Sequence, residues 1–372
     1  MSITTLKSSD ILSLVEDATN LGLSERVNIE DLNKTYGTKS NIFLVKQESD
    51  QFVFKLASAR EIQGETHGTS MVSKFLCVPK IYKYHINGNK SWLLREYIPG
   101  RLMADNIRDL ESKRKISLIQ SIEKEKEKQL LEMYRKTKKR VSFYDYLSLR
   151  ANDLFYKRIS GKRYKSFYGL SKSSIHKYTE KEITLNGRIF PHTIQENVSL
   201  ILSKYDKPRV DSVIGYLGHG DAHHGNILIN DSNKIWFYDN EYVGTMPAYM
   251  ELSKPYYNDF LGVLFFHFHD ILLGHFSVTG VEESKSELKI KIKSKNKISH
   301  RIDVTNIKLA VRREILKNGQ DFLTLNDYLF MSHILNRNPN NYPEEVRFLF
   351  IAFAMIITDF NPMFPESIYS YF

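Results

Sequence analysis

The sequence predicts an α+β chain with two lobes, in which a small antiparallel sheet precedes a mainly helical part. Near the start, the apolar runs 42–45 and 51–56 flank a polar turn, which is typical of a β-hairpin. Later apolar runs at 260–276 and 348–357 are interpreted as core helices, because the first is interrupted by His and Asp and the second is too short to span a bilayer. The length of 372 residues allows two lobes with a sizeable core.

The segment from His219 to Asn226, which reads His-Gly-Asp-Ala-His-His-Gly-Asn, is the most informative part of the chain. Phosphoryl transfer needs a group that orients the acceptor hydroxyl, and oxygen ligands that hold a cation against nucleotide phosphates. Asp221 would orient the hydroxyl, and the side chain of Asn226 would reach the same cavity. Taken alone, each of these residues would favour a surface turn.

Residues 226–238 predict a second hairpin, with Asp-Ser-Asn at 231–233 as its turn. Asp239 then follows the returning strand and is expected to lie beside Asn226. One amide oxygen and one carboxylate suit a hard octahedral cation that keeps several waters and bridges substrate phosphates. The expected metal is Mg²⁺, with Mn²⁺ as the alternative.

These loops resemble the catalytic and metal-binding loops of the aminoglycoside phosphotransferase and choline kinase family, whose fold is protein-kinase-like. Gly220 stands where protein kinases usually carry Arg, and His223 stands where they carry Lys, which favours the small-molecule branch. The resemblance covers about residues 33–265 and implies that His219 supports the catalytic loop and that Asp259 braces it. For His223, contact with the acceptor and a structural role remain equal alternatives.

The resemblance also implies a nucleotide clamp in the first lobe, for ATP or GTP. Lys55 ends the second run of the first hairpin among apolar residues, so its ammonium is expected to point into a polar cleft toward the phosphates. The preceding turn matches the glycine-poor phosphate loop of the family at Gly37, Ser40 and Asn41. Backbone amides of this turn would cradle the phosphates.

A lysine in such a cleft needs an acidic partner on the next helix. Glu61 and Glu65 are both available and share a helix face, because they are four residues apart. The spacing in the family favours Glu65 and leaves Glu61 as the alternative.

The run 92–100 is predicted to be a buried strand that ends in a Pro-Gly turn. It resembles the hinge that holds the purine in these kinases, so Glu96, Tyr97 and Ile98 are expected to contact the base. Without the other motifs, an ordinary strand would be the simpler interpretation.

Basic residues gather in three further segments. Residues 113–140 predict a mixed-charge helix with a solvated face supported by i to i+4 pairs. Alternating lysines at 289–297 predict a strand with an exposed, lysine-bearing edge that turns toward residues 298–302. The basic and aromatic stretch 156–168 is expected to contact the acceptor or to pack, with single-stranded nucleic acid as the third option.

The predicted domains are a nucleotide-clamping lobe, 1–98, and a catalytic and acceptor-binding lobe, 99–372, with a basic helical insert at about 105–200. The nucleotide is expected to bind between them. A single cysteine excludes an internal disulfide, and the start of the chain does not resemble a signal peptide, which together predict a cytoplasmic, non-spanning protein. The formal net charge of +10 does not by itself specify a partner.

The predicted function is transfer of the γ-phosphoryl group of ATP or GTP, with Mg²⁺, to a hydroxyl of a small molecule. An amino sugar, an aminoglycoside-like or choline-like compound and a glycan precursor are all compatible acceptors, although the basic surface argues mildly against strongly cationic ones. One alternative is a kinase that acts on a protein or a lipid-linked glycan. Another is a nucleotide-binding scaffold without turnover. Nucleic acid is not an expected partner, and the sequence does not specify the oligomeric state.

Overall fold

The structure is a computed structural model of the chain. It describes residues 13–15, 27–32, 41–47, 50–88, 91–169, 175–207, 211–265, 275–294, 299–317 and 321–372.

The chain forms two compact units. The first comprises Met1–Asn106 with Gly225–Val243, and the second comprises Ile107–His224 with Gly244–Phe372. This grouping differs from the predicted division at residue 98, because the later hairpin belongs to the first unit. Its strand β11 (Ile227–Ile229) pairs with the short strand β6, in which Leu102 lies opposite Leu228.

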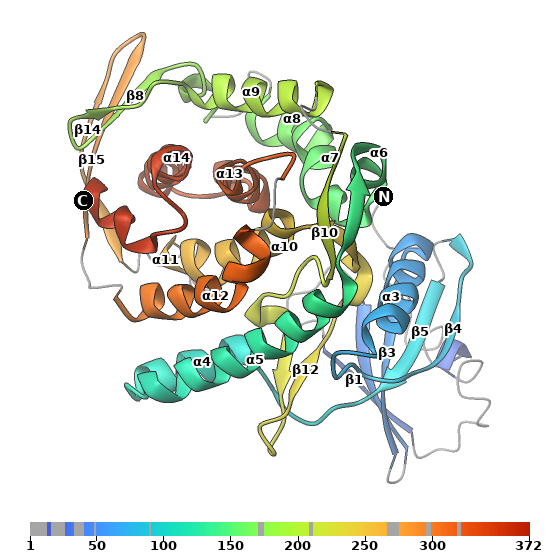
Figure 1. Cartoon of the computed structure of the whole chain (residues 1–372). Coiled ribbons are helices and arrows are strands. Elements are labelled where there is room, and N and C mark those ends of the chain that lie inside the picture. The colour runs from blue at the N-terminus through green and yellow to red at the C-terminus, as the bar shows by residue number, and fades with distance from the viewer. Residues whose placement is uncertain are drawn as a thin grey trace. The chain divides into compact units, whose positions relative to one another are not determined.

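The first unit is built on a five-stranded antiparallel sheet in the order β1-β2-β3-β5-β4 (Figure 1). The predicted hairpin at 42–56 is confirmed, since Ile42 pairs with Lys55 across β2 and β3. The predicted strand at 92–100 is β5. The strands are β1 (Val27–Asp31), β2 (Asn41–Gln47), β3 (Asp50–Ala57), β4 (Ile81–His85) and β5 (Ser91–Glu96).

Apolar side chains of this sheet form the core of the first unit. Full burial of one large apolar side chain contributes about 1.5–3 kcal/mol to the free energy of folding, relative to leaving it exposed. The fully packed set consists of Val15, Phe43, Val45, Phe54, Leu56, Trp92 and Leu94.

Helix α3 (Ala59–Val72) packs on the sheet and against the short helix η5 (Asn240–Tyr242). It begins with a capping box, in which the Ser58 side chain accepts from the backbone of Glu61 and the Glu61 carboxylate accepts from the backbone of Ser58. Gly68 permits the close approach to η5, because a Cβ atom there would lie 1.9 Å from the carbonyl oxygen of Asn240.

The second unit contains two sheets. A three-stranded antiparallel sheet has the order β13-β10-β7, and a four-stranded sheet has the order β14-β15-β8-β9. The first contains β7 (Lys139–Ser142), β10 (Ser212–Gly218) and β13 (Gly244–Pro247). The second contains β8 (Glu182–Leu185), β9 (Arg188–Ile189), β14 (Phe276–Glu283) and β15 (Glu287–Ser294).

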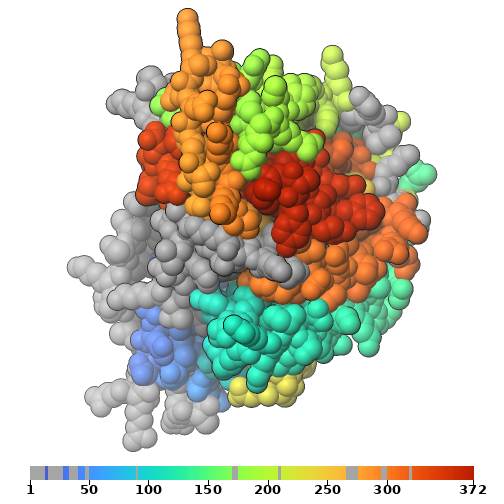
Figure 2. Space-filling model, turned by 90° about the vertical axis from the view of Figure 1, so that its left-hand side faces the viewer, coloured from blue at the N-terminus to red at the C-terminus, as the bar shows by residue number. Residues whose placement is uncertain are grey.

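The lysine-bearing strand is β15, and its lysines alternate with buried Leu288, Ile290 and Ile292, as predicted. Its predicted position at a sheet edge is wrong, because β15 lies between β14 and β8. Figure 2 shows the β14–β15 hairpin in orange beside the green β8–β9 segment. The predicted turn toward 298–302 is also wrong, since residues from Ser299 onward form a helix and β15 pairs with the preceding strand β14.

Helices make up most of the second unit. The predicted core helix at 348–357 is confirmed as the buried centre of α14. The run 260–276 is not one helix, because its last residue, Phe276, begins β14; residues 266–274 lie outside the described ranges. Over the described ranges, no helix combines the length and the apolar character needed to cross a bilayer.

The α-helices are α4 (Met103–Ser112), which begins in the first unit, α5 (Ile116–Thr137), α6 (Phe143–Ser148), α7 (Tyr156–Ile159), α8 (Lys162–Tyr168), α9 (Ile194–Asp206), α10 (Ala248–Tyr256), α11 (Gly262–Phe265), α12 (Ser299–Lys317), α13 (Leu325–Asn336) and α14 (Glu344–Asp359). The short helical turns are η2 (Arg150–Leu154), η3 (His176–Tyr178), η4 (His224–Asn226), η6 (Tyr257–Leu261), η7 (Pro339–Asn341) and η8 (Pro365–Tyr371).

The approach of α3 to η5 generates a testable prediction. Gly68→Ala is expected to lower the free energy of unfolding by more than about 1 kcal/mol, because the added methyl group meets a backbone carbonyl that cannot rotate away. Gln63→Ala, at an exposed position of the same helix, is the control and should change it by less than about 0.5 kcal/mol. Denaturant unfolding measures both, and equal effects would contradict the packing described.

Candidate active site

The first unit holds a buried ion-pair network around Lys55. The ammonium Nζ of Lys55 lies 2.6 Å from Oε2 of Glu65 and 3.1 Å from Oδ1 of Asp239. The predicted pairing with Glu65 is therefore present, whereas Glu61 is occupied in capping α3. Sequence reasoning missed Arg95 of β5, whose Nη1 binds the second oxygen of the Glu65 carboxylate.

Charge in this network keeps Lys55 protonated. Burial alone would lower the pKa of Lys55, but the carboxylates of Asp239 and Glu65 outweigh it and raise the pKa above its ordinary value. The side chain of Asp239 is 38% exposed, whereas that of Glu65 is buried. Lys55 is thus fixed from one side by Glu65 and meets, on the other, a carboxylate that solvent or a ligand can reach.

Asn226 and Asp239 lie at the same end of the β11–β12 hairpin. The hairpin has the predicted register, with Ile227 opposite Phe237 in strand β12 (Ile235–Phe237), and the backbone N–H of Tyr238 donates to the carbonyl of Asn226 at 2.9 Å. Asp239 follows directly with φ of 55°, a left-handed conformation that is uncommon for a residue other than glycine. Such strain often occurs where a side chain must be aimed.

These two side chains fit a Mg²⁺ site by the chemistry of their donors. Mg²⁺ is commonly held by one or two carboxylates together with substrate phosphates and waters, rather than by a complete protein cage. No group of three or more His, Cys, Asp or Glu residues suited to a metal occurs in the described part of the chain. Their role as metal ligands stays a prediction.

The other residues that are predicted to bind the nucleotide lie only partly within the described ranges. Gly37 and Ser40 lie outside the described residues, and Asn41 begins β2. At the predicted hinge, Ile98 is buried, while Glu96 and Tyr97 are half-buried. The Glu96 carboxylate accepts from the backbone N–H of Lys80 at 3.0 Å. No base contact is tested by these observations.

The loop that carries Asp221 belongs to the second unit and is held by Glu251 of α10. One carboxylate oxygen of Glu251 accepts from the backbone N–H of Gly220 at 2.7 Å, and the other accepts from that of His219 at 3.2 Å. Gly220 has φ of 80°, which a side chain would strain. Sequence reasoning missed Glu251, since a single acid inside a helix gives no local signal.

Asp221 follows the clamped glycine and keeps partial access to solvent. Its backbone N–H donates to Nδ1 of the buried His219 at 3.3 Å. This hydrogen bond is consistent with the predicted support of the loop by His219. Nε2 of His223 lies 3.9 Å from Oδ1 of Asp221, and both side chains are 16% exposed. This distance leaves both interpretations of His223 open.

Asp259 lies in the π-helical turn η6 and contacts the end of the same loop. Its Oδ1 accepts from the backbone N–H of His224 at 2.9 Å, and its Oδ2 pairs with Nζ of Lys308 at 2.5 Å. Burial would raise the pKa of Asp259, but charge on His224, Lys308 and Lys126 lowers it to about 2. The predicted bracing acid is therefore an ionised side chain with defined partners.

A larger buried charge cluster surrounds this contact. Nε2 of His224 lies 2.8 Å from Glu123, which also binds Lys126 at 2.6 Å and Lys308 at 3.1 Å. Lys126 continues to Glu127, which pairs with Arg312. Three carboxylates thus face three cations around one imidazole. The buried charge cluster consists of Glu123, Lys126, Glu127, His224, Asp259, Lys308 and Arg312.

This cluster corrects the predicted solvated face of the helix at 113–140. The alternating Glu and Lys residues of α5 include three that are fully buried, because α12 packs along α5 and supplies Lys308 and Arg312. Exposed i to i+4 pairs do occur on α5, for example Glu132 with Lys136. The local pattern alone does not distinguish the two faces.

Lys254 is a buried cation on α10, one turn after Glu251. It is 3% exposed, and its Nζ lies 5.6 Å from the centre of the Phe155 ring. Burial and the charge of Arg158 lower its pKa to about 7, although Asp221 acts in the opposite direction. A buried lysine whose pKa is lowered in this way is a candidate for a functional residue.

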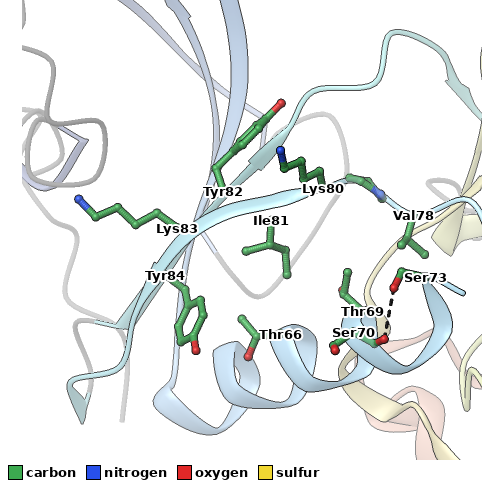
Figure 3. Close-up of a pocket in the computed structure, with 11 residues that line it drawn as sticks. Thr66, Thr69, Ser70, Ser73, Val78, Lys80, Ile81, Tyr82, Lys83 and Tyr84 are labelled. Carbon is green, nitrogen blue, oxygen red and sulfur yellow. Dashed lines mark hydrogen bonds between the residues drawn. The ribbon is translucent and has the colours of Figure 1, made fainter.

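A separate pocket of about 600 Å³ lies between α3 and the chain from Val78 to Tyr84 (Figure 3). Ile81 and Tyr84 point toward the hydroxyl-bearing residues of α3, and Ser73 donates to the carbonyl of Ser70 at 3.2 Å. None of the predicted site residues lines this pocket.

Comparison with known proteins gives structural matches only. No protein-family model and no curated protein matches the chain. An ethanolamine kinase of Plasmodium vivax is similar in structure with a TM-score of 0.52 at 12% identity, over 98% of this chain and 92% of the other. The AMP complex of a spectinomycin phosphotransferase gives 0.50 at 12% identity, over 98% and 99%. A thermostable aminoglycoside phosphotransferase mutant with ADP and hygromycin B gives 0.50 at 8% identity, over 96% and 97%.

These similarities confirm the predicted fold class. The chain has the fold of aminoglycoside phosphotransferases and of ethanolamine kinase, the group that its motifs resemble. At this level of identity the matches describe the fold alone.

The buried charge cluster generates a testable prediction. Lys308→Met is expected to lower the free energy of unfolding by about 3–5 kcal/mol, because it leaves Asp259 and Glu123 buried with an uncompensated charge. Lys136→Met carries the same substitution at the exposed Glu132 pair and should cost less than about 1 kcal/mol. Urea unfolding of both variants measures the difference. A cost below about 1 kcal/mol for Lys308→Met would show that the cluster is not a compensated network.

Proposed function

We propose that the protein is an ATP- or GTP-dependent, Mg²⁺-dependent phosphotransferase that moves the γ-phosphoryl group to a hydroxyl of a small molecule. The observation that carries the proposal is the Lys55 network. A buried lysine is oriented by Glu65 and faces Asp239, the partly exposed carboxylate beside Asn226. A lysine so held, next to a candidate metal ligand, is suited to bind nucleotide phosphates.

Each residue has a defined task in this proposal. Lys55 binds phosphate oxygens of the nucleotide while Glu65 keeps its ammonium in place. Asn226 and Asp239 would hold Mg²⁺, which when bound neutralises charge on the phosphates. Asp221 orients the acceptor hydroxyl and accepts its proton as the oxygen bonds to the γ-phosphorus, while the bond from that phosphorus to the bridging oxygen breaks and the nucleoside diphosphate leaves. The support for a nucleotide donor includes the AMP and ADP complexes of the structural neighbours.

Clamping of the loop backbone supports the assignment of Asp221. Glu251 fixes the amides of His219 and Gly220, and Asp259 fixes that of His224, so the loop is held on both sides of Asp221. Catalysis by positioning needs such rigidity, because small displacements of the base cost large factors in rate. A surface turn would not need two buried carboxylates to hold its amides.

Two substitutions separate the roles of the acids. Asp221→Asn is expected to lower the turnover number by about 10²–10⁴ with nucleotide affinity unchanged, since it removes only the base. Asp239→Asn is expected to remove the Mg²⁺ dependence of nucleotide affinity. Transfer from labelled ATP and GTP to a panel of hydroxyl compounds, together with calorimetric nucleotide binding, measures both. Asp231→Asn, in the exposed hairpin turn, is the control.

The proposal is rejected if no labelled nucleotide binds, or if it binds without transfer to any acceptor. Mg²⁺ dependence that persists in Asp239→Asn would show that the ligand is misassigned, and Asp221→Asn with full turnover would show the same for the base.

A further inference from the structure

We propose that the acceptor carries an oxyanion, a phosphate or a carboxylate, which binds to an oxyanion site formed by Lys254, Arg158 and Arg163 beside Asp221. The inference rests on the proposed function, because it identifies the substrate class of the same reaction. All four residues belong to the second unit.

The buried, uncompensated charge of Lys254 is the first observation. Its side chain is 97% buried, and no carboxylate forms an ion pair with it in the described part of the chain. Among the described residues of this unit, every other lysine that is buried to a similar degree pairs with a carboxylate, as Lys126 and Lys308 do within the buried charge cluster. An unpaired buried cation is costly in the free protein and is retained where a ligand supplies the counter-charge.

The position of Lys254 on α10 directs it to the catalytic loop. Glu251 lies three residues earlier on the same helix, and positions three apart share a face. Because Glu251 holds the amides of His219 and Gly220, the face that also carries Lys254 is turned toward the loop that bears Asp221. The interaction between Lys254 and Asp221 is strong enough to act on the lysine's pKa, without a direct ion pair.

The basic and aromatic stretch supplies the other two cations. Lys254 lies over the ring of Phe155, and the backbone N–H of Arg158, in α7, donates to the carbonyl of Phe155 at 3.0 Å. Arg163 begins the next helix, where one guanidinium nitrogen donates to the carbonyl of Asn336 at 2.9 Å. The two arginines lie on the two helices that follow Phe155, and the charge of each lowers the pKa of Lys254.

Two positive charges, Arg158 and Arg163, and only one negative charge, Asp221, act on Lys254, so positive charge is in excess around it. An oxyanion accepts several charge-assisted hydrogen bonds from ammonium and guanidinium groups, and arginine binds phosphate and carboxylate with two parallel bonds. A quaternary amine or a polyamine would instead be repelled. The acceptor is therefore expected to be a hydroxyl compound with a phosphate or carboxylate group.

Matched compounds that differ in charge test the inference. Calorimetry on the full chain without nucleotide compares glycerol with glycerol 3-phosphate, ribose with ribose 5-phosphate, and choline as the cationic member. At least one oxyanion is expected to bind at least about tenfold more tightly than its neutral partner. Lys254→Met should remove this preference, and Lys254→Arg should restore part of it.

The control is Lys293→Met, which makes the same charge change at an exposed position of β15. Because Lys254→Met removes a buried charge and keeps a similar side-chain length, it is expected to unfold at the same temperature as the wild type or above it, so lost binding is not lost folding.

Three results would overturn the inference: equal affinity for charged and neutral partners, preference for choline, or no binding of either oxyanion at millimolar concentration. Transfer from labelled ATP to the same compounds distinguishes the two proposals. Transfer only to neutral or cationic members supports the phosphotransferase and rejects the oxyanion site. Oxyanion binding that depends on Lys254, without transfer to any compound, supports the site and rejects the phosphotransferase.

Discussion

The pairing of buried charges is the constraint on which the second unit depends. Glu123 and Asp259 hold the loop that carries Asp221 at His224, yet neither carboxylate would be stable in the interior without cations beside it. Lys308 forms an ion pair with each of them, so the rigidity of the loop depends on how α12, which carries Lys308, packs. A cluster of this kind contributes little net stability compared with an apolar core, but it tolerates very few alternative arrangements, which fixes the position of the loop.

The first unit uses the same physical device on a smaller scale. Lys55 is held by Glu65 and meets Asp239, and Arg95 shares Glu65 with it. Here one carboxylate stays partly exposed, so the network is closed on the structural side and open on the side where a ligand would bind. The partly exposed Asp239 distinguishes the Lys55 network from the buried charge cluster, although both consist of the same residue types.

Local signals were sufficient for the hairpins, and the spacing in the family selected Glu65 as the partner of Lys55. Alternating apolar runs specified β2, β3, β11 and β12, and helical spacing narrowed the acid to two glutamates. Sequence reasoning failed where the deciding contact is distant in the chain. The buried face of α5 was predicted to be solvated because its partners Lys308 and Arg312 lie more than 180 residues away in the sequence. The edge position predicted for β15 was wrong because β15 also pairs in parallel with β8. Glu251 and Lys254 gave no signal at all, since only tertiary packing turns them toward the loop.

The order in which the chain is made adds a consequence to the buried charge cluster. Glu123, Lys126 and the catalytic loop leave the ribosome well before Lys308 and Arg312. Until those two residues arrive, the carboxylates outnumber their cations and stay hydrated, because burying them unpaired is unfavourable. Contacts between such distant segments also form slowly. The nascent chain therefore acquires its charged loop early and its fixed geometry late, so a chain that is interrupted before α12 leaves Glu123 and Glu127 of α5 without Lys308 and Arg312.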